Sequence, residues 1–209
     1  MDDAEPARDS EPELERKAAV DLYWIPLGAG AHVVRISGKL FEAASALVAR
    51  RPRCDLYHSA LVISAQEGHF VIEQAPVPDL HGERRGVVAE GPVGMRWLGR
   101  FRIFRYEIRR WREGRIPDIN QAIGSPVRVT DDVEVAGRIL ETLPSIPTPV
   151  WGRDEFDTGE MWNSNSVVSW VLTRSGASIV GIQPPTNGRA PGWDAGLAAA
   201  ARSLGENRG

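Results

Sequence analysis

Cysteine, lysine and long apolar runs are scarce in this chain of 209 residues. A single cysteine, Cys54, cannot form a disulfide within the chain or build a cysteine-rich zinc site. No apolar run approaches the roughly 20 residues that cross a bilayer. The acidic start lacks the charged-then-apolar layout of a signal peptide. From these absences we expect a cytoplasmic protein with no transmembrane segment.

The rest of the composition is typical of a globular domain. Hydrophobic residues make up 42%, and 25 basic against 28 acidic residues give a net charge of −3. Residues 1–17 hold seven acids and three bases without an apolar period, and we expect them to form a disordered acidic tail. Residues 18–209 are long enough for one domain with a buried core.

Apolar periodicity predicts the elements of this domain. Alternation and β-branched or aromatic residues predict strands over 20–25, 32–36, 57–63, 70–74 and 101–108, with a hairpin turn at Glu67-Gly68. Helical spacing predicts helices over 39–50, 131–143 (capped by Thr130), 163–175 and 193–204. The predicted fold class is α+β, with a central antiparallel sheet and flanking helices. The loop 188–193 is interpreted as packing the last helix on the core.

Metal and thiol chemistry find little support in the sequence. Cys54 and His58 would lie about 13 Å apart on one strand, too far for a hydrogen bond. The four histidines show no HxH or HExxH spacing. We therefore expect no metal and no cofactor, and Cys54 is interpreted as a small buried side chain or a loop thiol.

An arginine-rich stretch covers residues 83–115, where ten arginines and four acids stand among several aromatic residues. Such a mixture suits nucleic acid in some proteins. Here Phe101 and Ile103 alternate with Arg102, which predicts a strand with one solvated face. Because the net charge offers no electrostatic attraction, we expect no nucleic-acid partner.

A run of small polar residues, Asn163-Ser164-Asn165-Ser166, opens the third predicted helix. Serine and asparagine are preferred helix N-caps, so capping alone explains the run. The same place also suits a nucleophile, because free N–H groups and the helix dipole stabilise an anion there. Both interpretations remain open at this point.

The order of motifs resembles a known family. A strand histidine in Tyr57-His58-Ser59-Ala60-Leu61-Val62-Ile63 is followed by an acid in Phe70-Val71-Ile72-Glu73, and much later by Asn163-Ser164-Asn165-Ser166-Val167-Val168-Ser169-Trp170. This resembles the circularly permuted papain-like hydrolases, which are related to NlpC-type peptidases and to lecithin:retinol acyltransferase. Their motif, Asp-Cys-Ser-Gly or Asn-Cys, is similar to the stretch that begins at Asn163.

The resemblance implies acyl transfer at an amide, isopeptide or ester bond of a peptide, lipid or protein substrate. Ser164 would be the nucleophile, His58 the base and Glu73 the residue that orients His58. Trp162, Asn163 and Asn165 would line the oxyanion hole and the cleft. The alternative is a catalytically inactive relative that binds a peptide, lipid or protein partner in the same groove.

Two departures from the family pattern matter. Serine stands where the family has cysteine, so Ser164 is a working serine, an inactive remnant or an engineered change. A turn at Glu67-Gly68 would also place Val62 opposite Glu73, four residues from His58. In that register Gln74, or a residue outside the hairpin, would orient His58 instead.

Overall fold

The computed structural model describes residues 18–27, 54–77, 86–116 and 118–206. The tail predicted at 1–17, the strand at 32–36 and the helix at 39–50 lie outside the described residues.

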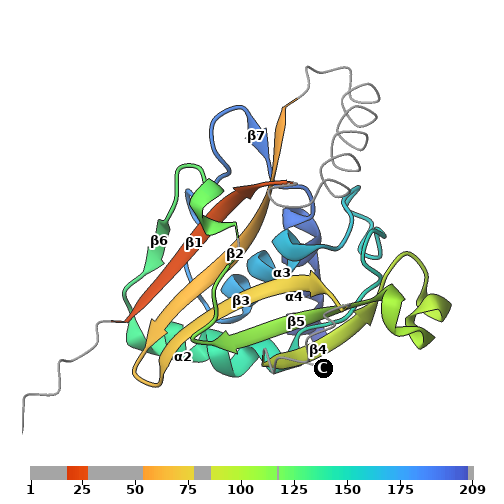
Figure 1. The fold of residues 1–209 in the computed structure, drawn as a ribbon, viewed down its shortest axis with the longest axis horizontal. Helices are drawn as coiled ribbons and strands as arrows, with labels where there is room; N and C mark the ends of the chain where they lie inside the picture. Colours follow the sequence, from red (N-terminus) through yellow and green to blue (C-terminus); the bar gives the residue numbers. More distant parts are fainter. Residues whose placement is uncertain (1–17, 28–53, 78–85, 117, 207–209) are drawn as a thin grey trace, which may run out of the picture.

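A mostly antiparallel sheet of seven strands forms the centre of the described part, in the order β4-β5-β3-β2-β1-β6, with the short β7 pairing with β2. This confirms the predicted α+β class. Figure 1 shows the sheet running across the molecule. The strands are β1 (Ala19–Pro26), β2 (Asp55–Ala65), β3 (Gly68–Pro76), β4 (Val87–Pro92), β5 (Arg105–Arg112), β6 (Val127–Thr130) and β7 (Gly188–Arg189).

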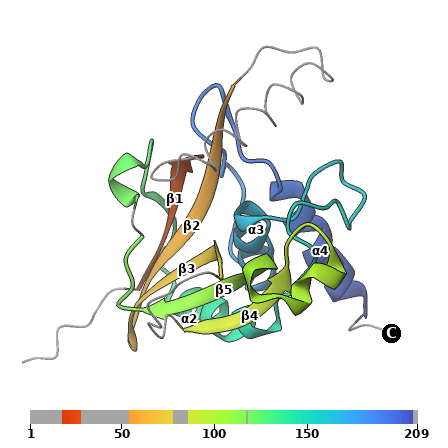
Figure 2. The ribbon, with the colours of Figure 1, turned by 45° about the vertical axis from the view of Figure 1, so that its right-hand side comes forward.

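Three helices cover one face of this sheet: α2 (Val133–Thr142), α3 (Ser164–Arg174) and α4 (Trp193–Glu206). Figures 1 and 2 show them together on the same side. Apolar side chains of β1, β2, β3 and β5 meet the helices in the larger core cluster. The opposite face carries a smaller cluster, made by Ile25, Ala60, Val71 and Ile116.

The β2–β3 hairpin turns one residue earlier than the sequence predicted. Ala65 pairs with Gly68, so Gln66 and Glu67 form the loop. Gly68 has a φ of +131°, a conformation that favours glycine. As a result Val62 lies opposite Val71 and not opposite Glu73. The β2–β3 pairing ends at Leu61 and Ile72, which leaves the first half of β2 without β3 beside it.

The predicted strand 101–108 was wrong in its first half. Residues 102–104 form a 3₁₀ turn, η2 (Arg102–Phe104), which follows η1 (Arg96–Arg100), and the strand β5 begins at Arg105. Phe101 and Ile103 are exposed on these turns, so their alternation with Arg102 does not report a sheet face. The remaining 3₁₀ turns are η3 (Ile119–Gln121) and η4 (Leu143–Ser145).

The helix predicted over 131–143 exists but begins later, because Asp132 and not Thr130 caps it. The Asp132 carboxylate accepts hydrogen bonds from the N–H groups of Glu134 and Val135. No helix among the described residues is long and apolar enough to cross a membrane.

Candidate functional site

The start of α3 is held by reciprocal capping, as its sequence predicts. Asn163 Oδ1 accepts a hydrogen bond from the Asn165 N–H at 2.8 Å, and Ser166 Oγ accepts one from the Asn163 N–H at 3.1 Å. Ser164 is the first helical residue and is half-buried. Its hydroxyl makes no hydrogen bond to another described residue. The helix then buries its predicted apolar face: Val167, Val168, Trp170, Val171 and Leu172.

Asn165 ties this helix start to β2. Its Nδ2 donates to the carbonyl of Tyr57 at 2.9 Å, and its Oδ1 accepts from Ser59 Oγ at 2.8 Å. Asn165 and Ser59 are 2% and 1% exposed, so both bonds are shielded from water. His58 lies between the two contacted residues. The structure therefore brings the polar helix start beside the stretch of β2 that carries His58.

This contact is made at an edge of β2. The Leu27 N–H donates to the carbonyl of Leu56, so that carbonyl points toward β1. The next carbonyl, at Tyr57, points the other way, toward the side where β3 no longer pairs. Asn165 fills that vacated side. A side-chain amide thus replaces the neighbouring strand at this point.

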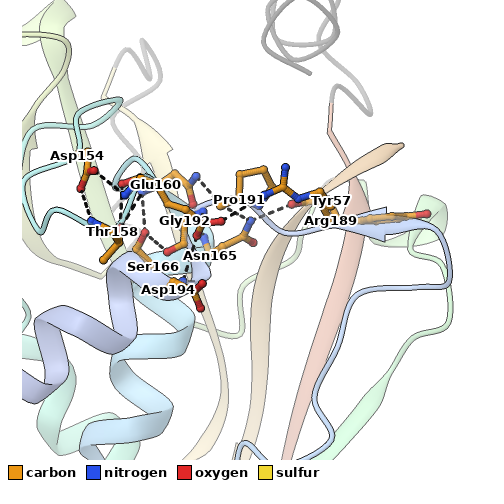
Figure 3. Close-up of polar contacts among 12 residues, drawn as sticks. Tyr57, Asp154, Thr158, Glu160, Asn165, Ser166, Arg189, Pro191, Gly192 and Asp194 are labelled. Atoms are coloured by element: carbon orange, nitrogen blue, oxygen red, sulfur yellow. Dashed lines mark hydrogen bonds and ion pairs between the residues drawn. The ribbon is translucent and has the colours of Figure 1, made fainter. Parts of the chain in front are cut away.

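The loop 188–193 completes the site from the far end of the chain (Figure 3). The Pro191 carbonyl accepts from Nδ2 of both Asn163 and Asn165 at 2.8 Å, and the Gly192 carbonyl accepts from Ser166 Oγ at 2.6 Å. Trp193 then packs on Trp24, with ring centroids 5.5 Å apart. This loop therefore packs the last helix on the core, as predicted.

Glu160, in the loop that precedes α3, is hydrogen-bonded to the start of α4. Its carboxylate accepts from the N–H groups of Gly192 at 2.8 Å and Asp194 at 3.1 Å, at the start of α4. Arg189 lies 3.7 Å away as an ion-pair partner. Burial raises the pKa of Glu160, although the two N–H donors oppose this shift. The carboxylate acts as an N-cap supplied from another segment, a role that the sequence did not indicate.

His58 lies on the other face of β2 from Ser59. It pairs with Ile25, whose side chain belongs to the smaller core cluster. Burial lowers the pKa of His58 to about 4, and the negative charge of Asp118 acts in the opposite direction. The imidazole is therefore neutral at pH 7. No hydrogen bond joins it to Ser164 among the described residues.

Glu73 is occupied by a different partner. It pairs across the strands with Arg109, and its Oε1 lies 3.0 Å from Arg109 Nη1. The same guanidinium binds Glu107 through a second ion pair. Arg109 is 3% exposed, so the three charges form a buried cluster in which neither carboxylate is left unpaired.

The remaining site predictions fall outside this contact. Trp162 is fully buried and packs on Phe156 with a centroid distance of 5.8 Å, so its side chain belongs to the core and not to a cleft. Cys54 directly precedes β2 and is partly exposed. Within the described ranges, no three histidine, cysteine or acidic side chains are grouped to hold a metal ion.

One residue that acts on His58 was missed from the sequence, and another was given too little weight. Asp118 is the charged group that acts on His58, and nothing in its neighbourhood marked it. Gln74 carries a buried amide whose Nε2 and Oε1 both lack a hydrogen-bond partner. The sequence had named Gln74 only as an alternative to Glu73. A buried amide in an apolar stretch of β3 was the signal available.

Comparisons with protein-family models, curated proteins and solved structures gave no match. The chemistry of the site must therefore be argued from its own residues.

Proposed function

We propose that the chain is an acyl-transfer enzyme of the circularly permuted papain-like type, with Ser164 as nucleophile and His58 as general base. The observation that carries the proposal is a pair of hydrogen bonds on either side of His58: Asn165 donates to the Tyr57 carbonyl and accepts from the Ser59 hydroxyl. They hold the first turn of α3 next to the base-bearing strand. The order of base strand before nucleophile helix is the order expected of the permuted fold.

Each group has a role in this proposal. Ser164 lies at the positive end of α3, where the helix dipole stabilises negative charge. His58 is neutral at pH 7 and can accept a proton, but burial lowers its pKa and makes it a weak base. Asp118 takes the role first given to Glu73, since its charge favours the imidazolium that forms. Glu73 stays with Arg109 as part of the buried charge cluster.

The reaction conserves atoms and protons. The Ser164 oxygen attacks the carbonyl carbon of an amide, isopeptide or ester while its proton passes to His58. The imidazolium then protonates the departing amine or alcohol. Water then attacks the acyl-serine ester with His58 again as base, which releases the acid and restores Ser164. The His58 side chain lies on the face of β2 opposite Ser59 and α3, so the proton transfer requires a rearrangement of β2 that turns the imidazole toward Ser164.

A fluorophosphonate probe tests the proposal, since it reacts only with activated serines. We expect one adduct on the intact protein, mapped by peptide mass spectrometry to Ser164 and lost in Ser164→Ala and His58→Ala. Ser145→Ala is the matched control, because Ser145 is exposed and has no role in the proposed reaction. Absence of any adduct in the wild-type chain, while its unfolding curve is normal, contradicts the proposal.

A second candidate is a non-catalytic relative that uses the same surface to bind a peptide, lipid or protein. It is favoured by the engagement of Glu73 with Arg109 and by the lack of a hydrogen bond between Ser164 and His58. Ser164→Cys separates the two candidates. A thiol that becomes reactive indicates an intact site limited by serine, whereas an inert thiol supports the binding role.

A further inference from the structure

A group of exposed apolar side chains projects from the molecule between β4 and β5. We call residues 95–104 the apolar projection. Successive backbone hydrogen bonds, from Leu98 to Met95, Phe101 to Leu98 and Phe104 to Phe101, build it as two 3₁₀ turns. Its large apolar residues are Met95 (46% exposed), Trp97 (56%), Phe101 (46%), Ile103 (70%) and Phe104 (37%).

The connection between β4 and β5 does not require a segment of this length. β4 and β5 are antiparallel neighbours that already pair at Pro92 and Arg105, and a short hairpin loop would join them. None of the residues in η1 or η2 is buried. Figures 1 and 2 show the two turns standing out beyond the ends of the strands. A contiguous apolar patch of this kind on a monomer marks an interaction surface.

The charged residues of the projection itself are all arginines. Arg96, Arg100, Arg102 and Arg105 lie in or beside it, and no acidic residue occurs from 91 to 106. Glu155 binds Arg96 and Glu90 binds Arg105. Arg100 and Arg102 make no ion pair with a described residue. The chain as a whole is acidic, so this is a local basic surface.

Arginine and aromatic groups are interleaved within the projection. The Arg100 guanidinium carbon lies 5.2 Å from the Trp97 ring centroid and 4.8 Å from that of Phe101. Trp97 Nε1 also donates to Met95 Sδ at 3.2 Å. The cation thus sits between apolar rings that are themselves open to solvent, the arrangement used by side chains at a membrane–water interface.

We propose that the apolar projection docks on an anionic phospholipid surface. Trp97, Phe101 and Ile103 enter the boundary between headgroups and acyl chains, while Arg100 and Arg102 bind headgroup phosphates. The projecting shape suits insertion into a bilayer better than a protein groove. Ile103, the most exposed large apolar residue of the projection, can neither stack on a base nor donate a hydrogen bond to one, which argues against nucleic acid.

Vesicle flotation with the full chain tests this proposal. We expect binding to vesicles of phosphatidylcholine with about 30% phosphatidylserine, in keeping with attraction to an anionic leaflet. Binding to phosphatidylcholine alone should be much weaker and binding to the anionic vesicles should fall with salt. Among the seven tryptophans of the chain, Trp97 is the one that is exposed. Its fluorescence should therefore shift to the blue on binding, and Trp97→Phe should abolish the shift while keeping most of the affinity.

Paired variants separate the apolar and the charged parts. Trp97→Ala with Phe101→Ala should weaken binding by about tenfold or more. Arg100→Gln and Arg102→Gln should each weaken it by about fivefold. Val180→Ala is the control, because Val180 is 90% exposed at another place, and it should leave binding unchanged.

Three results would overturn the proposal. One is a lack of binding to the anionic vesicles, and a second is binding that the projection variants leave unchanged. The third is a demonstration that the projection serves another partner. Loss of a dimer in Trp97→Ala, measured by sedimentation velocity, would assign it to a second copy of the chain. Binding of a mixed oligonucleotide that Arg100→Gln abolishes, without vesicle binding, would assign it to nucleic acid.

Discussion

Replacing Asn165 by alanine should destabilise the fold more than any other polar substitution at the start of α3. The side chain makes two buried hydrogen bonds, with Tyr57 and Ser59, and a part-buried one with Pro191. The Pro191 carbonyl keeps a second donor from Asn163. The Tyr57 carbonyl and the Ser59 hydroxyl lose the partner that Asn165 supplies.

Leaving a buried polar group without a partner costs about 1–3 kcal/mol. Two such groups give a loss of about 2–6 kcal/mol in the free energy of unfolding for Asn165→Ala. In a domain of this size a loss of about 3 kcal/mol lowers Tm by about 6–12 °C. Ser59→Ala breaks one bond and should cost about 1 kcal/mol.

Denaturant unfolding followed by circular dichroism measures these losses. Asn120→Ala is the matched control, because Asn120 is exposed on η3 and its loss should change stability by less than about 0.5 kcal/mol. If Asn165→Ala falls within about 0.5 kcal/mol of this control, the two buried bonds do not hold α3 against β2 and the reasoning is refuted.

Three further predictions concern other parts of the fold. The pKa of His58 is about 4 in the folded chain against an ordinary value of 6.5, so the unfolded chain binds its proton first as pH falls. The neutral, buried His58 should therefore contribute on the order of 3 kcal/mol of stability above about pH 6.5, and this contribution should be lost as pH falls to about 4. Denaturant unfolding of His58→Gln at several pH values should lack this part of the pH dependence. Arg109→Met should lower the free energy of unfolding by about 3–5 kcal/mol, because it leaves two buried carboxylates unpaired. Arg115→Met, at an exposed position, should change it little. Equal effects of the two variants in chemical denaturation would contradict the buried cluster. Gly196→Ala should cost about 1–3 kcal/mol of stability, because the added Cβ would meet backbone and side-chain oxygens of α3. Gly137→Ala, whose Cβ meets open space on α2, should raise stability by up to about 1 kcal/mol. Thermal melts that do not show these opposite signs would refute the close approach of α3 and α4.

Local signals in the sequence predicted much of the secondary structure. Alternating residues identified β1, β2 and β3, and the asparagine–serine run identified the start of α3. Alternation misled at Phe101-Arg102-Ile103. Two periods of a two-residue pattern are too few to distinguish a strand from a 3₁₀ turn. The exposure of Phe101 and Ile103 in the structure shows that this segment is not a half-buried strand. The strand β4 was missed because its Gly and Pro content favours a loop.

The contacts of the candidate site were beyond sequence reasoning, because they join distant residues. Asn165 and the Tyr57 carbonyl are 108 positions apart, and Glu73 and Arg109 are 36 apart. Only the sheet order places β5 beside β3 and gives Glu73 an arginine as its partner. The hairpin register illustrates the same point, since a shift of the turn by one residue changed which side chain lies opposite Val62.

The reactivity of a thiol placed at the start of α3 tests most directly whether this site activates a nucleophile. In Ser164→Cys, alkylation by iodoacetamide is measured as a function of pH, and Cys54 in the same chain provides a reference peptide. The account predicts that the helix dipole lowers the apparent thiol pKa at position 164 below the usual value of about 8.5, and that alkylation at pH 7 slows when His58→Ala is added. A thiol of ordinary pKa that His58→Ala leaves unchanged would contradict the central claim.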